Sequence, residues 1–180
     1  MSRLPIPTRD EAPAASQKIL DAVSHQLGTI PNMFRLLAQS PAALEGYTAL
    51  SAALNRTLDA KTRERIAVAV AAVNGCDYCM SAHSYLGANL AHLDEAELTA
   101  NRRGHSNDAK ADAAVAFATA IAQTRGNVSD ASIEAVKQAG FTDAQVIDIV
   151  LNVALNVLTN FVNNVSETDI DFPIVRAKAA

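Results

Sequence analysis

The sequence predicts an all-α domain of about seven to eight helices. Hydrophobic residues make up 49% of the 180 residues, which is typical of a chain that folds around a core. Alanine is abundant, while there are only 7 glycines and no tryptophan, a mix that favours closely packed helices. No alternation of apolar and polar residues persists for more than a few positions. We therefore expect one domain over 1–180, with an extended arm at 1–10 and a tail at 166–180.

The first elements are delimited by prolines and glycines. Pro5 and Pro7 argue against a helix in the arm, and Gly28 is a typical residue at which a helix ends. Proline is tolerated in a first helical turn and disfavours helix in the residue before it. These signals predict a helix over 11–27, a short helix before residue 41, and a third helix over 41–55.

The remaining elements begin at residues that cap helices. Asp59 predicts the start of a helix that runs to Asn74, where Gly75 ends it. A helix that carries both cysteines follows. Asp108, Ser129 and the Thr142–Asp143 pair are further capping signals. We thus expect helices over 59–74, 76–90, 95–101, 108–124, 129–140 and 142–165.

Charge and hydropathy argue against several classes of partner. A net charge of −4 gives no general attraction to nucleic acid or to an anionic membrane. The most apolar stretch, 149–165, is interrupted by asparagines, and the first 13 residues lack the apolar run of a signal peptide. We expect a cytoplasmic protein, a setting in which a cysteine pair is more often catalytic or metal-binding than structural.

Cys76, Cys79 and His83 form the most informative motif. They stand at positions i, i+3 and i+7, which share one face of a helix. Because Gly75 precedes them, both sulfurs lie in or next to a first helical turn, where free N–H groups and the helix dipole stabilise a thiolate. The three-residue spacing also allows a disulfide. This pattern predicts thiol redox chemistry without a metal.

Glu64 joins this motif through the glycine turn. If the two helices are antiparallel, Glu64 lies roughly 16 Å before Gly75 and His83 roughly 12 Å after it, so their side chains can be neighbours. A carboxylate there would orient His83 and raise its basicity. His83 could then take a proton from a cysteine.

The spacing Glu-x11-Cys-x2-Cys-x3-His resembles the core motif of the AhpD-like, or carboxymuconolactone decarboxylase-like, superfamily. The segment IPNMFRLLAQSP and the asparagine-rich last helix extend the likeness to its peroxidase-related branch, over about 20–170. The resemblance implies a homo-oligomer, a trimer or hexamer, that reduces hydroperoxides with an external dithiol or protein reductant. Cys79 would be the peroxidatic thiolate, Cys76 the resolving cysteine, and Glu64 with His83 the proton relay. No cofactor beyond the Cys76–Cys79 disulfide is implied.

One position departs from the family. Alkylhydroperoxidases carry a second histidine between the cysteines, whereas Tyr78 stands there in this chain. A phenol does not exchange protons near neutral pH as an imidazole does. The departure concerns peroxidase activity and the identity of the reductant, and leaves the dithiol chemistry unaffected.

Alternative interpretations remain open. The cysteines could belong to a non-catalytic zinc-binding or redox-sensing module, or be inert in a helical oligomer. Decarboxylase activity is a weaker alternative, because that branch lacks the cysteine pair. Covalent haem is not expected, because Met80 occupies the position of the histidine in a CxxCH motif.

The last helix carries an amide every four residues. Buried amides need hydrogen-bond partners, which backbone, water or a neighbouring subunit can supply. The other interpretation is that some of them, together with Tyr78, line a substrate pocket near the thiols; Asn156 and Asn160 are the candidates. The four positions are Asn152, Asn156, Asn160 and Asn164.

Overall fold

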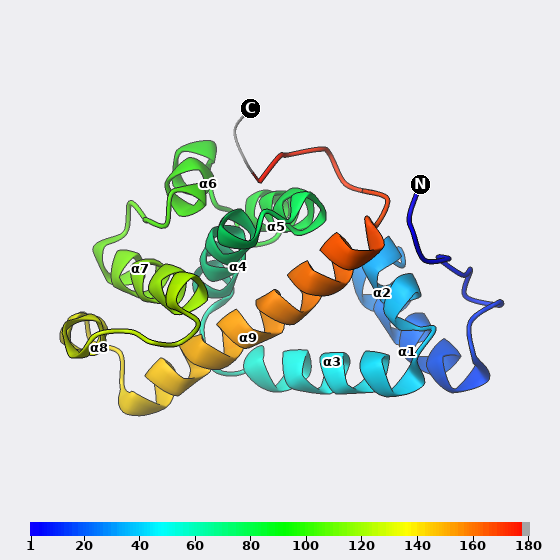
Figure 1. The fold of residues 1–180 in the computed structure, drawn as a ribbon, viewed down its shortest axis with the longest axis horizontal. Helices are drawn as coiled ribbons and strands as arrows, with labels where there is room; N and C mark the ends of the chain where they lie inside the picture. The colour runs from blue at the N-terminus through cyan, green and yellow to red at the C-terminus, as the bar shows by residue number, and fades with distance from the viewer. Residues whose placement is uncertain (178–180) are drawn as a thin grey trace.

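The computed structural model describes residues 1–177 and contains nine α-helices and no strand within that range (Figure 1). The all-α prediction is confirmed. Eight of the helices are longer than seven residues; α2 has six. In chain order the helices are α1 (Ala14–Leu27), α2 (Asn32–Leu37), α3 (Pro41–Leu54), α4 (Ala60–Asn74), α5 (Asp77–Asn89), α6 (Glu95–Arg102), α7 (Ala109–Thr124), α8 (Asp130–Gln138) and α9 (Asp143–Ser166).

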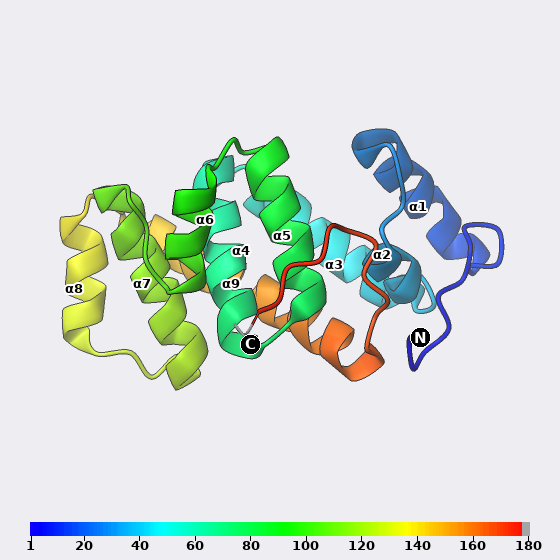
Figure 2. The ribbon, with the colours of Figure 1, turned by 90° about the horizontal axis from the view of Figure 1, so that it is seen from above.

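Helix α4 is the centre of the fold. It packs against α5, α6, α7 and α9, and residues 66–71 of it are all buried (Figures 1 and 2). Val68 and Ala71 belong to the core cluster shared with α1, α2 and α5. Ile66 and Val70 belong to the second cluster, shared with α7, α8 and α9. One helix with two apolar faces therefore joins both cores, and it is the helix that carries Glu64.

The helix ends follow the capping signals in the sequence. Asp59 accepts a hydrogen bond from the Thr62 N–H at 3.0 Å, and Gly75 ends α4 in the left-handed region at φ 62°. Thr142 and Gln145 form a reciprocal capping box at the start of α9. Asp108 and Ser129 likewise cap α7 and α8.

Helix α1 begins at Ala14, three residues later than predicted. Pro13 has φ −48° and ψ 137°, which is not helical. Upstream, the Glu11 carboxylate accepts hydrogen bonds from the Thr8 N–H and hydroxyl, each at 2.8 Å. This local turn uses the side chain of Glu11, so the chain enters the helix only after the proline.

Residues 167–177 of the predicted tail pack along α5 (Figure 2), and its last three residues lie outside the part of the chain that the structure describes. Val175 exchanges two hydrogen bonds with the Ser81 hydroxyl, and Arg176 forms an ion pair with Asp77 at 2.7 Å. The N-terminal arm lies close by, since the Arg3 N–H donates to the Ser166 carbonyl at 2.7 Å. We call residues 167–177 the C-terminal strap.

Helix α9 is the one helix in the described part of the chain that is long and apolar enough to cross a membrane by these two criteria. It packs, however, against α3, α4, α5, α7 and α8. Its inner face is buried and its outer face is apolar and exposed. The high hydropathy of α9 therefore has two sources, a buried face that packs in the core and an apolar face that is exposed.

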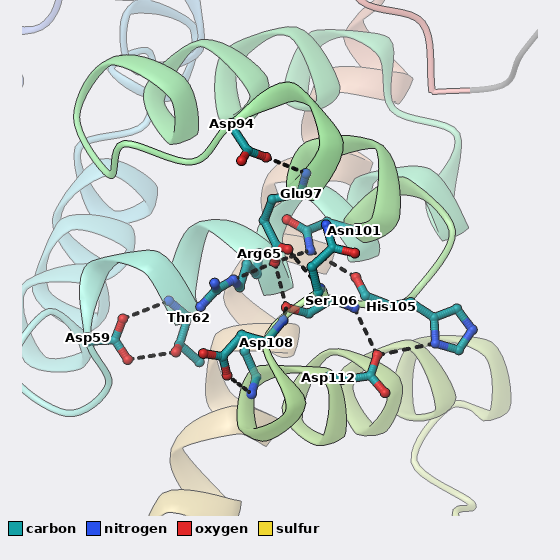
Figure 3. A network of polar contacts seen from close by, with 12 residues as sticks. Asp59, Thr62, Arg65, Asp94, Glu97, Asn101, His105, Ser106, Asp108 and Asp112 are labelled. Atoms are coloured by element: carbon teal, nitrogen blue, oxygen red, sulfur yellow. Dashed lines mark hydrogen bonds and ion pairs between the residues drawn. The ribbon is translucent and has the colours of Figure 1, made fainter.

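A buried polar network holds α4, α6 and the loop before α7 together (Figure 3). The Glu97 carboxylate accepts from Arg65 Nε at 2.7 Å, Asn101 Nδ2 at 3.0 Å and the Asn107 N–H at 2.8 Å. It also accepts from the Ser106 hydroxyl. Burial disfavours the charged form, but these donors outweigh it and lower the pKa of Glu97 to about 2. The network thus ties α4 to α6 and to the loop before α7.

Candidate functional site

The turn at Gly75 makes α4 and α5 an antiparallel pair, as the sequence predicted. The Cys76 N–H donates to the Ala71 carbonyl at 3.0 Å, which closes the turn tightly. Glu64 and His83 consequently face each other, with 2.9 Å between Glu64 Oε2 and His83 Nδ1. Both side chains keep about a fifth of their surface exposed. A carboxylate bonded to Nδ1 orients the ring and leaves Nε2 available for proton exchange.

Cys76 precedes α5 as its N-cap residue. Its Sγ accepts a hydrogen bond from the Cys79 N–H at 3.3 Å, and its surface is fully buried. Its thiol also hydrogen-bonds the Cys79 sulfur, and this bond, followed by burial, raises the pKa of Cys76. Cys76 is therefore the cysteine that keeps its proton.

Cys79 has the opposite character. The hydrogen bond from Cys76 is the largest influence that lowers the pKa of Cys79; burial opposes it. His83 lowers the pKa further by its charge, and the neighbouring Asn163 and Asn160 amides lower it as well. Asn163 Nδ2 lies 3.3 Å from Cys79 Sγ. Of the two cysteines, Cys79 is thus the one prepared to be a thiolate.

His83 gains basicity from the same arrangement. Burial lowers the pKa of His83, but the Glu64 carboxylate, by charge and hydrogen bond, and the Cys79 sulfur raise it, and the net shift is upward. A cationic His83 one turn after Cys79 stabilises the thiolate. The arrangement can therefore hold a thiolate–imidazolium pair and return the proton to a leaving group.

A cavity of about 750 Å³ opens beside these residues. Cys79, His83 and Glu64 contribute to its wall, whereas Cys76 does not. Its other walls come from α1, α2, α3, α9, the strap and further residues of α4 and α5. They are largely apolar and include the rings of Phe34, Tyr47, Tyr85 and Phe172. A ligand in this cavity can reach Cys79 but not Cys76.

The predicted pocket residues separate into two groups. Tyr78 and Asn156 line the cavity. Asn160 does not line it, because the amide is fully buried between α9 and α4, where its Oδ1 accepts from Asn74 Nδ2 at 2.8 Å. Asn160 therefore faces the thiol from behind instead of facing the cavity.

Tyr78 serves as a fastening point for the strap. Its hydroxyl donates to Asp171 Oδ1 at 2.8 Å and accepts from the Met33 N–H at 3.1 Å. Its ring meets Phe172 edge-on, with 5.9 Å between centroids. Burial and the Asp171 carboxylate raise the pKa of Tyr78. The phenol thus joins α2, α5 and the strap, and a role as proton donor is unfavourable.

Asn163 contacts Cys79 directly and was missed by the sequence reasoning. The four-residue repeat drifts around the helix, so Asn164 ends on the exposed side and donates to the Asn74 carbonyl at 3.0 Å. Asn156, Asn160 and Asn163 are spaced four and three residues apart, the spacing of one helix face. A search at that spacing, instead of strictly every fourth residue, would have found Asn163.

Within residues 1–177, no three His, Cys, Asp or Glu side chains are arranged to hold a metal ion.

Comparison with known proteins places this geometry in context. The profile of the Carboxymuconolactone decarboxylase family matches residues 41–100, the segment that contains Glu64, both cysteines and His83. An uncharacterised protein of Haemophilus influenzae is 52% identical over 48 residues, a match that spans 26% of this chain and 42% of that relative.

Two crystal structures are similar over almost the whole chain. The alkylhydroperoxidase AhpD core, peroxidase-related protein of Ralstonia eutropha is 26% identical, with a TM-score of 0.84 over 94% of this chain and 92% of that one. A peroxidase-related protein of Silicibacter sp. is also 26% identical, with a TM-score of 0.81 over 93% and 91%.

Proposed function

Because the chain belongs to the AhpD-like, carboxymuconolactone decarboxylase-like superfamily, we propose that it is a thiol-dependent hydroperoxidase that uses Cys79 and Cys76. The peroxidase-related relatives support an antioxidant-type function in general. The observation that carries the specific proposal is the environment of Cys79. This sulfur faces the cavity, accepts from Asn163 at 3.3 Å, and lies one turn before a histidine that is bonded to Glu64.

The first step transfers an oxygen atom to sulfur. The Cys79 thiolate attacks the terminal oxygen of a hydroperoxide, so that an S–O bond forms and the O–O bond breaks. Sulfur loses two electrons, and the peroxide is reduced to an alcohol. His83 donates a proton to the departing alkoxide, while Glu64 stabilises the imidazolium before the transfer.

The second step forms the disulfide. Cys76, which hydrogen-bonds Cys79 in the reduced protein, attacks the sulfenic sulfur. The S–S bond forms, the S–O bond breaks, and the proton of Cys76 leaves with the oxygen as water. An external dithiol or a protein reductant then reduces the disulfide. Because the cavity reaches Cys79 alone, we expect the reductant to attack that sulfur.

We also propose that the protein acts in the cytoplasm as a homo-oligomer without a metal or organic cofactor. The outer face of α9 supports self-association. Its exposed apolar residues recur at alternating spacings of four and three, the pattern of a helix seam that packs against another helix. These residues are Ile147, Leu151, Ala154, Leu158, Phe161 and Val165.

A screen of organic hydroperoxides with several dithiol reductants tests the proposed activity. Wild-type protein should consume peroxide, and Cys79→Ser should not. In Cys76→Ser, peroxide should leave a trappable sulfenic acid at Cys79. Sulfenic acid trapped only at Cys76, in the Cys79→Ser protein, would reverse the two roles. One zinc ion per purified chain, with no disulfide after mild oxidation, would favour the zinc-binding alternative instead.

A further inference from the structure

Two buried amides behind Cys79 have hydrogen-bonding capacity that residues 1–177 do not use. Asn160 is fully buried and its Nδ2 has no hydrogen-bond partner among them. Asn163 is 1% exposed and its Oδ1 likewise has none. A buried donor without a partner destabilises the folded protein, so such a group in the middle of a site calls for an explanation.

The orientation of Asn160 is fixed by α4. Its Oδ1 accepts from Asn74 Nδ2 at 2.8 Å, which directs the Nδ2 group away from Asn74. The amide influences the Cys79 sulfur, yet it completes no hydrogen bond with the sulfur in the reduced protein. Asn163, one turn further along α9, does complete one, at 3.3 Å. Two N–H donors from one helix face are therefore directed at one sulfur, and only one of them is used.

We propose that Asn160 and Asn163 form an oxygen-binding pair that takes up the oxygen atom which Cys79 acquires from peroxide. This inference rests on the proposed function. In the thiolate, Asn163 is the only one of the two amides that hydrogen-bonds the sulfur. When the S–O bond forms, the new oxygen provides an acceptor for the free Nδ2 group of Asn160. The transferred oxygen keeps its hydrogen and arrives as the neutral oxygen of a sulfenic acid, which can accept from both amides. When the sulfenic acid ionises, these hydrogen bonds become roughly twice as strong as neutral ones, so the pair lowers the pKa of the sulfenic acid.

The pair has a second consequence for the order of events. An oxygen held on the α9 side leaves the opposite side of the sulfur open to Cys76, which approaches from the start of α5. Departure of that oxygen as water is needed when the disulfide forms. The two asparagines therefore orient the S–O bond for attack by Cys76 on the sulfur. They also hold the oxygen atom of the sulfenic acid away from the cavity.

The test compares three alanine variants in a Cys76→Ser background. Serine keeps an oxygen that can cap α5, and removal of the resolving thiol lets the sulfenic acid accumulate. The variants are Asn160→Ala, Asn163→Ala and, as a control, Asn164→Ala, whose amide is on the same helix but bonds the Asn74 carbonyl. Oxidation by tert-butyl hydroperoxide is followed at about pH 9, where the ordinary thiol is ionised, so that differences in thiol pKa contribute little.

Loss of either donor should slow oxidation of Cys79 by roughly threefold to tenfold, the effect of losing one neutral hydrogen bond to the transferred oxygen. Dimedone trapping should persist to higher pH in both variants, because the sulfenic acid ionises less readily. Asn164→Ala should differ from the background by less than about twofold. If Asn160→Ala does not fold, Asn160→Asp, which keeps the acceptor for Asn74, should show the same slowing.

Two other outcomes have distinct meanings. Asn160 and Asn164 variants with the same oxidation rate and the same pH profile would overturn the oxygen-binding pair and leave the proposed peroxidase intact. No sulfenic acid at Cys79 in the background protein itself would overturn both.

Discussion

Cys76 and Cys79 are chemically identical residues three positions apart, yet their surroundings assign them different tasks. Cys76 is a fully buried helix cap that retains its proton, because its hydrogen bond with Cys79, followed by burial, raises its pKa. Cys79 lines the cavity. Its pKa is lowered by Cys76 and His83, which lie at and in α5, and by the Asn163 and Asn160 amides of α9. The direction of attack follows from this asymmetry, since the sulfur that ionises is also the one that a peroxide can reach.

The relay formed by Glu64 and His83 gives a prediction on thiol ionisation. Wild-type Cys79 should be alkylated half-maximally below the ordinary thiol pKa of about 8.5. His83→Ala removes a cation and Glu64→Gln lowers the pKa of His83, so each should move that midpoint to higher pH. Each should reduce peroxide turnover by roughly tenfold to a thousandfold.

The double variant provides the control for this prediction. Both residues act through one imidazolium, so Glu64→Gln/His83→Ala should be little worse than His83→Ala alone. The measurement is iodoacetamide alkylation against pH, followed by peroxide turnover. Unchanged thiol ionisation in both single variants would refute the relay.

Among the elements, the C-terminal strap has the most direct link to the site. It supplies Phe172 to the cavity wall and is fastened to α5 by Tyr78, Ser81 and Asp77. The phenol of Tyr78 occupies the position where alkylhydroperoxidases carry a histidine, and here it donates to Asp171. The residue that departs from the family motif thus has a structural task, because it connects α5 to the strap and to α2.

Tyr78→Phe should loosen the strap without changing the ring. The Met33 N–H and the Asp171 carboxylate lose their partner, which should lower stability by about 1–2 kcal/mol. Hydrogen exchange at Val175 and Ala177, whose N–H groups bond α5, should become faster. Tyr85→Phe is the matched control, because that exposed ring also packs on Phe172. Equal exchange in the two variants would show that the phenol does not hold the strap.

The Glu97 network, which joins α4 to α6 and to the loop before α7, gives a prediction on stability. Its donors lower the pKa of Glu97 to about 2, so its contribution is present above the ordinary pKa near 4.3 and is lost as the pH falls toward 2. Glu97→Gln should therefore destabilise the protein at pH 7 by roughly 2–4 kcal/mol. The difference from wild type should shrink below about pH 4.

Urea unfolding at a series of pH values measures this effect. Glu95→Gln is the control, because its carboxylate is 74% exposed and pairs with Arg102, a surface ion pair that contributes less than about 1 kcal/mol. A Glu97→Gln protein as stable as the Glu95 variant at pH 7 would contradict the role given to the network.

At the scale of the whole molecule, α9 has two faces with different tasks. The inner face brings Asn163 to Cys79 and Asn156 to the cavity. The outer face exposes large apolar side chains, with Phe161 at 56% and Val165 at 66%. Contiguous apolar surface of this kind in a soluble domain is typical of an interface. The helix that carries Asn156 and Asn163 to the site is therefore also the helix on which we expect a second copy of the chain to bind.

Phe161→Glu should break the expected homo-oligomer by placing a charge in the centre of this seam. Sedimentation velocity should give a lower mass than wild type, with unchanged helix content by circular dichroism. Leu4→Glu, which changes an exposed apolar residue outside α9, should keep the wild-type mass. A wild-type mass for Phe161→Glu would exclude this face as the interface.

The sequence by itself determined the features that depend on neighbours along the chain. The caps at Asp59 and Thr142, the stop at Gly75, and the shared face of Cys76, Cys79 and His83 all follow from spacings within one helix or one tight turn. The Glu64–His83 contact could be predicted as well, because only the short turn at Gly75 separates their helices. Helical geometry fixes such neighbours to within a residue.

Only the tertiary structure decided which distant residues complete the site. Asn163 meets Cys79 across 84 residues of sequence, and Asp171 meets Tyr78 across 93. The rotation of α9 about its own axis selects Asn163 over Asn164, and one residue corresponds to about 100° of that rotation. That angle is set by how the apolar side chains of α4 and α9 pack together. The residue pattern of a single helix predicts which of its faces is apolar. It does not predict which distant residue will hydrogen-bond each polar side chain on that helix.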